Sequence, residues 1–130
     1  MSSSFEPKSG PIFVEGEITG PVRSVTIRLI LDTGATTSLI NQRVLIGIGF
    51  DPTGSGAPSE KIEMTTGSTV ERVSRVTLTR FSALGQHRFG FSVLAHDLPR
   101  GAAVDGLLGL DFLRGQILTV DFAKGQITLA

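Results

Sequence analysis

The sequence predicts a single, mostly β domain, and three observations support this prediction. The chain has 130 residues, which is about the length of one domain with one core. Its 16 glycines, together with many Val, Ile, Leu and Thr residues, favour short strands and tight turns over long helices. Runs of alternating or continuous apolar residues recur between turn residues. We expect residues 1–10 to form a flexible leader and residues 11–130 to form the domain.

The expected strands follow one another along the chain. Residues 12–18 partly alternate between apolar and polar, and residues 22–31 alternate before becoming continuously apolar near Asp32. Gly20-Pro21 makes the turn between them, so the two runs form a hairpin. The later expected strands cover residues 61–66, 69–79, 86–95, 117–122 and 126–129. Most of the regular structure is therefore expected to be strand.

Helices are expected to be few and short. One is predicted near the C-terminus, at residues 111–114. The sequence leaves a second one open, within residues 38–49. There Asn41 is a candidate N-cap, and Gly47 or Gly49 would end the helix.

Charge, cysteine content and hydropathy exclude several classes of function. Twelve basic and twelve acidic residues give a formal charge of zero, and the basic residues are scattered, so we expect no nucleic-acid partner. Without cysteine there is no disulfide, thiolate nucleophile or zinc–thiolate site. No apolar run has the length of a membrane span, and the first residues do not resemble a signal peptide. A cytoplasmic location is expected, with a soluble piece of a longer anchored protein as the alternative.

A single carboxylate stands where the second expected strand ends, in the run Leu31-Asp32-Thr33-Gly34-Ala35. An ionised carboxylate in apolar surroundings is costly unless it is hydrogen-bonded or partly neutralised. The glycine permits a tight turn, and the threonine supplies a short hydroxyl side chain. This placement indicates acid–base chemistry, although one such loop supplies only one aspartate. The alternative is a turn aspartate that caps its own loop.

The other polar candidates are predicted to have ordinary roles. Asp105 could act as an internal partner of Asp32, but no Thr-Gly follows it, so a loop aspartate is expected. Asp111 is expected to face the positive end of a short helix. His87 and His96 have no second ligand at a metal-binding spacing, so we expect no metal site and no cofactor.

Two motifs together resemble the retropepsin-like aspartic protease family. Asp32-Thr33-Gly34-Ala35 after an apolar strand is similar to the active-site loop of that family. Residues 106–113, Gly-Leu-Leu-Gly-Leu-Asp-Phe-Leu, resemble its second motif, in the form found in small bacterial members. Thr65-Thr66-Gly67 lies where a flap hairpin is expected, although it could be an ordinary hairpin tip. The resemblance covers residues 12–129, and DTGA and GLLG occur in the expected order and at the expected distance.

The resemblance implies a closed acid-protease barrel and a homodimer in which each subunit contributes one Asp32. Two adjacent carboxylates cannot both ionise comfortably, so they share one proton. One then takes a proton from water while the other donates to the carbonyl oxygen of an extended peptide or protein substrate. No metal, cofactor or covalent intermediate is needed. The implied activity is that of an aspartic endopeptidase.

The resemblance also implies roles for neighbouring residues. Thr33 ties the two active-site loops together through its hydroxyl, and Gly34 lets the backbone reach the carboxylate. Ala35 is typical of the dimeric members, which agrees with a chain too short for two lobes. The support from the second motif is assigned to Leu107, Leu108 and Gly109.

The chain departs from retroviral enzymes in two respects, which suggests a different subfamily. Those enzymes pair an acid after the first motif with an arginine after the second glycine, whereas Thr36 or Thr37 and Leu110 stand there in this chain. The flap has one central glycine, Gly67, instead of a glycine-rich tip. The terminal strands need not build the dimer interface as they do in retroviral enzymes.

Two alternative functions remain at this stage. The first is a catalytically silent module that keeps the fold and binds extended peptides or supports assembly. The second is a monomeric enzyme that pairs Asp32 with Asp105 inside one chain.

Overall fold

The protein is described by a computed structural model that covers residues 2–8, 10–51, 59–66, 68–99 and 103–130, with the backbone alone over 59–66. The strands are β1 (Ser2–Ser4), β2 (Phe13–Thr19), β3 (Ser24–Leu31), β4 (Leu39–Ile40), β5 (Ser59–Thr66), β6 (Thr69–Ala83), β7 (Gln86–Ala95), β8 (Gly106–Leu108), β9 (Leu118–Asp121) and β10 (Gln126–Leu129). The helices are α1 (Gln42–Gly47) and α2 (Leu110–Leu113).

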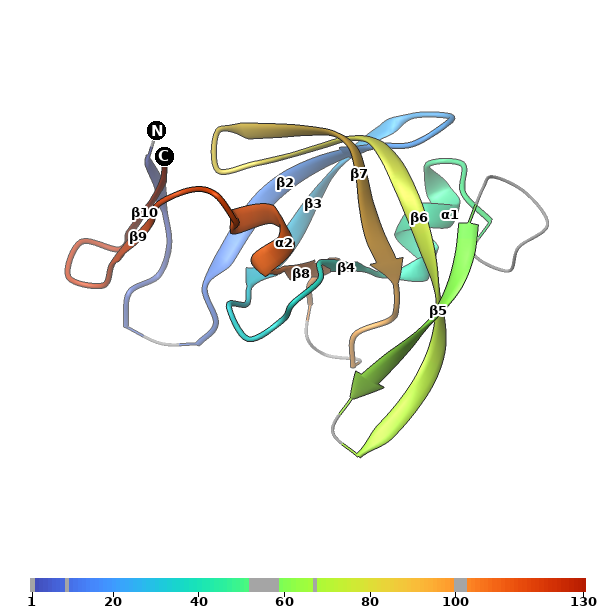
Figure 1. Ribbon diagram of the computed structural model, residues 1–130. Coiled ribbons are helices and arrows are strands. Elements are labelled where there is room, and N and C mark those ends of the chain that lie inside the picture. The colour runs from blue at the N-terminus through green and yellow to red at the C-terminus, as the bar shows by residue number, and fades with distance from the viewer. Residues whose placement is uncertain (1, 9, 52–58, 67, 100–102) are drawn as a thin grey trace.

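The central part of the molecule is a closed barrel. Strands β2, β3, β8, β4, β7 and β6 are hydrogen-bonded in that order, and β2 also pairs with β6. This last pairing closes the sheet, which removes the two exposed edges that an open sheet would present. β5 pairs with β6 outside the ring, and the β5–β6 hairpin projects away from the barrel (Figure 1). The mostly β, closed-barrel prediction is confirmed.

Alternating side chains from the barrel strands build the core. In β2 the buried residues are Val14, Gly16 and Ile18, and in β3 they are Ile27 and Leu29. A cluster of phenylalanines fills the space under α2, with ring centroids 5.2 to 5.7 Å apart, and consists of Phe81, Phe91 and Phe112. Each large apolar side chain that is fully buried contributes about 1.5–3 kcal/mol to folding.

β6 is longer than the sequence predicts. The expected strand ended at residue 79, but β6 continues to Ala83 because its last residues pair with both β7 and β2. Leu84 and Gly85 then turn the chain with φ values of 52° and 76°. Two consecutive positive φ angles are typical of the tight turns that match the twist of a hairpin.

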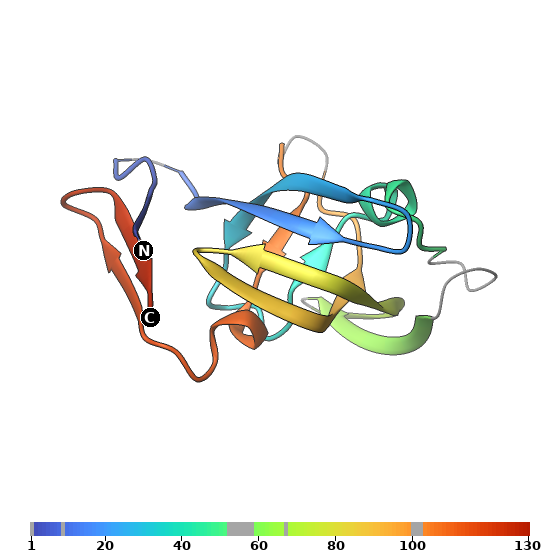
Figure 2. The ribbon, with the colours of Figure 1, turned by 90° about the horizontal axis from the view of Figure 1, so that it is seen from above.

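A small sheet of β1, β10 and β9 lies at one end of the barrel, with the two chain termini side by side (Figures 1 and 2). Part of the expected leader, residues 1–10, is therefore strand. Ser2–Ser4 pairs with β10, the Phe5 N–H donates to the Gly125 carbonyl (2.8 Å), and the Phe5 ring meets Phe122 edge-on. This pairing gives the backbone N–H and C=O groups on one side of β10 their hydrogen-bond partners. No local pattern in residues 1–10 predicts it. The boundary at residue 10 stays a prediction.

Both helices occur where the sequence placed them, but Asn41 does not cap α1 with its side chain. Asn41 occupies the N-cap position, yet its Nδ2 donates to the Val104 carbonyl (3.1 Å) and its Oδ1 accepts from the Leu98 N–H (2.9 Å). The first helical N–H, that of Gln42, donates to Asp97 instead (2.8 Å). Neither helix, within the part of the chain described, is long and apolar enough to cross a membrane.

Candidate active site

Asp32 follows the last residue of β3 and is held by its own loop. Its N–H donates to the Leu108 carbonyl (2.9 Å), which continues the β3–β8 ladder by one bond. Its carboxylate Oδ1 accepts a hydrogen bond from the Gly34 N–H (2.9 Å), and its carbonyl accepts one from Ala35 (3.1 Å). The side chain is half-buried. The loop therefore presents a fixed carboxylate that remains open to solvent.

Thr33, Gly34 and Ala35 lie together around this carboxylate, as the motif predicts. A Cβ atom on Gly34 would lie 3.1 Å from Asp32 Oδ1, which is tighter than ordinary contact. Glycine thus lets the backbone N–H approach the carboxylate without a side chain between them. Thr33 and Gly34 are exposed, and Ala35 is half-buried.

The second motif lies directly beside the Asp32 loop. β8 runs parallel to β3, with Leu107 beside Ile30 and Leu108 beside Leu31, and Leu108 is fully buried. A Cβ atom on Gly109 would lie 2.7 Å from the Ala35 carbonyl oxygen. The chain after Asp32 therefore crosses over the second motif at a distance that only glycine permits.

Gly106 marks a second close crossing, at the other end of β8. A Cβ atom there would lie 2.1 Å from the Leu39 carbonyl oxygen of β4. β8 is thus inserted between β3 and β4, parallel to one and antiparallel to the other. This insertion is what brings the two motifs together.

Ser38 and Asp111 connect the Asp32 loop to the segment after the second motif, and the sequence did not predict this contact. Asp111 lies in the first turn of α2, as expected, but its carboxylate binds Ser38 from the far end of the Asp32 loop. Ser38 is fully buried. The one signal in the sequence was a charged residue inside the otherwise apolar run of residues 107–113.

The residues expected to form a flap are described only in part. Thr65 and Thr66 end β5, where they pair with Val70 and Thr69 of β6, and Gly67 lies outside the described residues. The β5–β6 hairpin extends from the lower side of the barrel in Figure 1. The expected hairpin is therefore present, but its action as a flap stays a prediction.

Asp105 is not a partner of Asp32 within the chain. Its carboxylate Oδ2 accepts the Arg28 N–H (2.9 Å), and its own N–H donates to the Arg28 carbonyl (2.7 Å). Asp105 therefore lies level with Arg28, four residues before Asp32 on the parallel strand. At ~3.3 Å per residue, the two aspartates are about 13 Å apart along the strands. The single-chain pair is thereby excluded.

The histidines belong to other parts of the surface. His96 Nε2 lies 2.8 Å from Glu71 Oε2, and His87 Nδ1 lies 2.7 Å from Ser82 Oγ.

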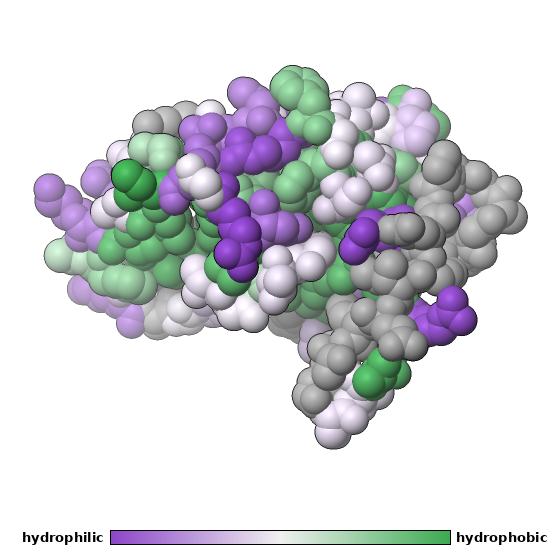
Figure 3. Space-filling model, in the orientation of Figure 1, coloured by the Kyte–Doolittle hydropathy of each residue, from purple (hydrophilic) through white to green (hydrophobic). Residues whose placement is uncertain are grey.

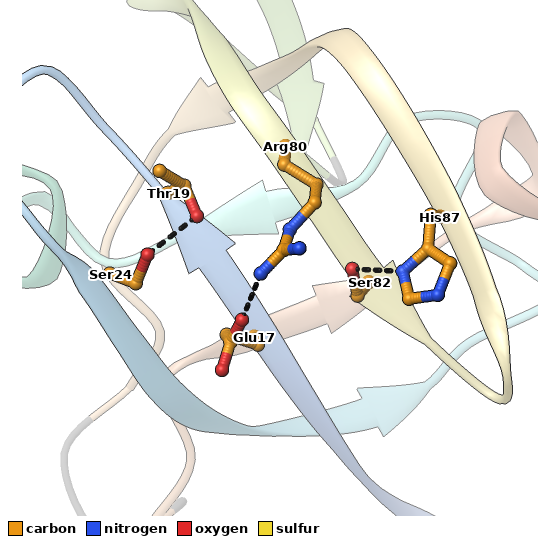
Figure 4. A network of polar contacts seen from close by, with 6 residues as sticks. All are labelled: Glu17, Thr19, Ser24, Arg80, Ser82 and His87. Atoms are coloured by element: carbon orange, nitrogen blue, oxygen red, sulfur yellow. Dashed lines mark hydrogen bonds and ion pairs between the residues drawn. The ribbon is translucent and has the colours of Figure 1, made fainter.

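Three cross-strand pairs share the outer face of the barrel in Figure 4, namely Glu17 with Arg80, Thr19 with Ser24, and Ser82 with His87. Such pairs each stabilise a sheet by about 0.2–1 kcal/mol. Among the described residues, no group of three His, Cys, Asp or Glu side chains could hold a metal ion.

A closed β barrel with an Asp-Thr-Gly-Ala loop locked against a Leu-Leu-Gly motif defines an aspartic protease domain. The chain belongs to the aspartyl protease family, whose family model (Asp_protease_2) matches residues 14–112. That range contains the Asp32-Thr33-Gly34-Ala35 loop and all of the second motif except Leu113. A comparison with curated proteins found no match.

Solved structures support the same fold. The chain is similar to a retropepsin-like aspartic protease from Rickettsia conorii, with a TM-score of 0.71, 17% identity, and coverage of 99% of this chain and 88% of that one. It is also similar to the retroviral protease-like domain of Ddi1 from Leishmania major, with a TM-score of 0.55, 19% identity, and coverage of 95% and 96%. At these identities the likeness shows the fold alone. The retropepsin-like resemblance of the sequence is confirmed.

Proposed function

We propose that the chain is an aspartic endopeptidase whose active unit is a homodimer with one Asp32 from each subunit. The observation that carries this proposal is a half-buried carboxylate, oriented by Gly34 at the end of β3, while the carboxylates of Asp105 and Asp111 are bound to Arg28 and Ser38. The same loop exposes Thr33, which is free to meet its copy across a two-fold axis.

The chemistry follows from two carboxylates that share one proton. The ionised Asp32 takes a proton from a water molecule, and the water oxygen attacks the peptide carbonyl carbon. The protonated Asp32 of the partner subunit donates to the carbonyl oxygen, which gives a neutral tetrahedral intermediate. Asp32, which now carries the proton from water, donates it to the amide nitrogen, and the C–N bond breaks. A hydroxyl group of the intermediate returns its proton to Asp32 of the partner subunit, so that an amine and a carboxylic acid are released. General acid–base assistance of this kind contributes about 10²–10⁴-fold to the rate.

The terminal sheet supplies one surface suited to a second copy of the chain. β1 and β9 are its outer strands, and outer strands can pair with another chain. Two large apolar residues that flank β9 are exposed, Ile117 at 71% and Phe122 at 60%. Hydrophobic side chains gather over this end of the molecule in Figure 3. Burying these side chains between subunits would favour association.

The substrate class is an extended peptide or unfolded protein segment. The β5–β6 hairpin, in which Thr65 and Thr66 end β5, is proposed to cover the bound segment. Gly67, the third residue expected to take part, lies outside the described residues. β5 is also the outermost strand of the seven-stranded sheet, and exposed strand edges bind extended chains through backbone hydrogen bonds.

The test replaces Asp32 by asparagine and measures cleavage of an unfolded protein. Asp32→Asn keeps an Oδ1 acceptor for the Gly34 N–H, so the loop should keep its shape, but an amide cannot accept the proton from water. We expect the loss of detectable cleavage with no change in dimerisation. Asp105→Asn is the matched control, because it keeps an acceptor for the Arg28 N–H, and it should cleave like the unmodified chain.

Cleavage by the Asp32→Asn variant would contradict the proposal, and so would its loss in Asp105→Asn with dimerisation intact. A chain that dimerises and binds an unfolded peptide without cleaving it would instead support the silent binding module.

A further inference from the structure

The Asp111 carboxylate binds the far end of the Asp32 loop with both of its oxygens. Oδ2 accepts the Ser38 N–H (3.0 Å), and Oδ1 accepts the Ser38 hydroxyl (2.7 Å). Oδ1 also accepts the N–H of Phe112 in its own helix (2.9 Å). One carboxylate thus accepts three hydrogen bonds from two segments that are 73 residues apart.

Ser38 also binds the second motif. Its hydroxyl donates to Asp111 and at the same time accepts the Gly109 N–H (3.0 Å). Ser38 is fully buried, so no water replaces the hydroxyl if it is removed. The Gly109 N–H would then be left without a partner, which is unfavourable for a buried donor.

The arrangement requires a carboxylate and excludes the isosteric amide. Both oxygens of Asp111 face at least one backbone N–H, that of Ser38 on one side and that of Phe112 on the other. An asparagine has one oxygen and one NH₂ group, so either orientation sets the NH₂ group against a backbone donor. Asp97 differs, because the N–H of Gln42 reaches only its Oδ1.

The Asp32 loop is therefore fixed at both ends to the same short segment, residues 108–111. At its start, the Asp32 N–H bonds to Leu108, and at its end, Ser38 bonds to Asp111. Between these points, the Ala35 and Thr36 carbonyls accept the N–H groups of Leu110 and Asp111, at 2.8 and 3.2 Å. Among these contacts between the Asp32 loop and residues 108–111, Asp111 supplies the charged side chain.

We propose that Asp111 and Ser38 form a clamp that positions the Asp32 carboxylate for catalysis. This inference rests on the proposed endopeptidase function. Asp111 is a positioning residue, because it acts through the loop and not on the substrate. A misplacement of the reacting group by about 1 Å can lower a rate by about 100-fold.

The clamp predicts a specific kinetic pattern. In Asp111→Asn, kcat should fall by about 100-fold while KM stays the same, because the peptide-binding surface is unchanged and the reacting carboxylate is displaced. Ser38→Ala, which leaves the carboxylate in place, should lower kcat by about 10-fold, with the same constant KM. Asp97→Asn, the matched control, should change neither.

The folded fraction separates positioning from a loss of folded protein. A variant that is only partly folded loses kcat in proportion to its unfolded fraction, which circular dichroism measures. The clamp instead predicts that kcat falls in protein that is fully folded. If Asp111→Asn does not fold, Ser38→Ala decides the question.

Amide hydrogen exchange tests the clamp even if the unmodified chain cleaves nothing. In that case the proposed function fails, while the clamp still predicts faster exchange at Gly34 and Gly109 in both clamp variants than in Asp97→Asn. Unchanged exchange there, or a folded clamp variant with an unchanged kcat, would overturn the inference.

Discussion

The Asp32 loop and the β5–β6 hairpin are held in different ways. The loop is fixed by backbone bonds to Leu108, by the close crossing at Gly109 and by the Asp111 carboxylate. The hairpin is held mainly by the pairing of its two strands, because β5 lies outside the closed ring. The Asp32 carboxylate therefore lies on a loop held by several tertiary contacts, whereas the hairpin proposed to cover the substrate projects from the barrel.

The largest effect is expected from Gly109→Ala, which disrupts the close approach of the second motif to the Asp32 loop. In Gly109→Ala the new Cβ would meet the Ala35 carbonyl oxygen at 2.7 Å and the Thr37 carbonyl carbon at 3.0 Å, and backbone atoms cannot rotate away. We expect a loss of about 3 kcal/mol or more in the free energy of unfolding. Thermal unfolding measures this as a fall in Tm of roughly 10 °C or more.

Gly47→Ala is the matched control for that substitution. Gly47 ends α1, and a Cβ atom there would meet nothing within 4 Å. Alanine also favours helix over glycine, so Tm should stay the same or rise by the equivalent of up to about 1 kcal/mol. Equal effects at the two glycines would show that the crossing does not constrain the loop.

A smaller effect, on KM, is expected from a substitution in the β5–β6 hairpin. Val70 lies near the tip of the hairpin and is 60% exposed, so Val70→Ser should change the free energy of unfolding by less than about 0.5 kcal/mol. If the hairpin covers the substrate, losing part of an apolar contact there should raise KM by about fivefold and leave kcat unchanged. Steady-state kinetics on an unfolded protein substrate measures both.

Ile46→Ser tests whether this effect belongs to the hairpin. Ile46 is 57% exposed on α1, so its loss is chemically similar but lies outside the hairpin. KM should stay unchanged in this variant. A rise in KM for both variants, or for neither, would remove the argument that the β5–β6 hairpin meets the substrate.

Local patterns in the sequence were enough to predict most of the strands and to find the Asp32 loop. The alternation in residues 12–18 and 22–31 reflects the two faces of β2 and β3, and the turn residues mark the hairpins. The Asp32 loop was recognisable because a strand, a carboxylate and a glycine are adjacent in the chain. The second motif was recognisable only through the family resemblance, since nothing local indicates that Gly109 crosses Ala35.

The missed features all depend on contacts between distant parts of the chain. Ser38 meets Asp111 across 73 residues, and neither residue alone carries a signal for the other. Asn41 has the residue type of an N-cap, but tertiary contacts to Val104 and Leu98 take its side chain instead. The sequence already favoured a loop aspartate at Asp105, and its contacts with Arg28, in register with the β3–β8 pairing, confirm this expectation.

The central claim is that two chains share one active site, and mixing active with inactive subunits tests it most directly. The unmodified chain and Asp32→Asn are combined in equal amounts, unfolded together and refolded so that subunits pair at random. Only dimers of two unmodified chains carry two aspartates, so we predict about one quarter of the activity of the same total amount of unmodified protein. About one half, the value for independent subunits, would contradict the shared site.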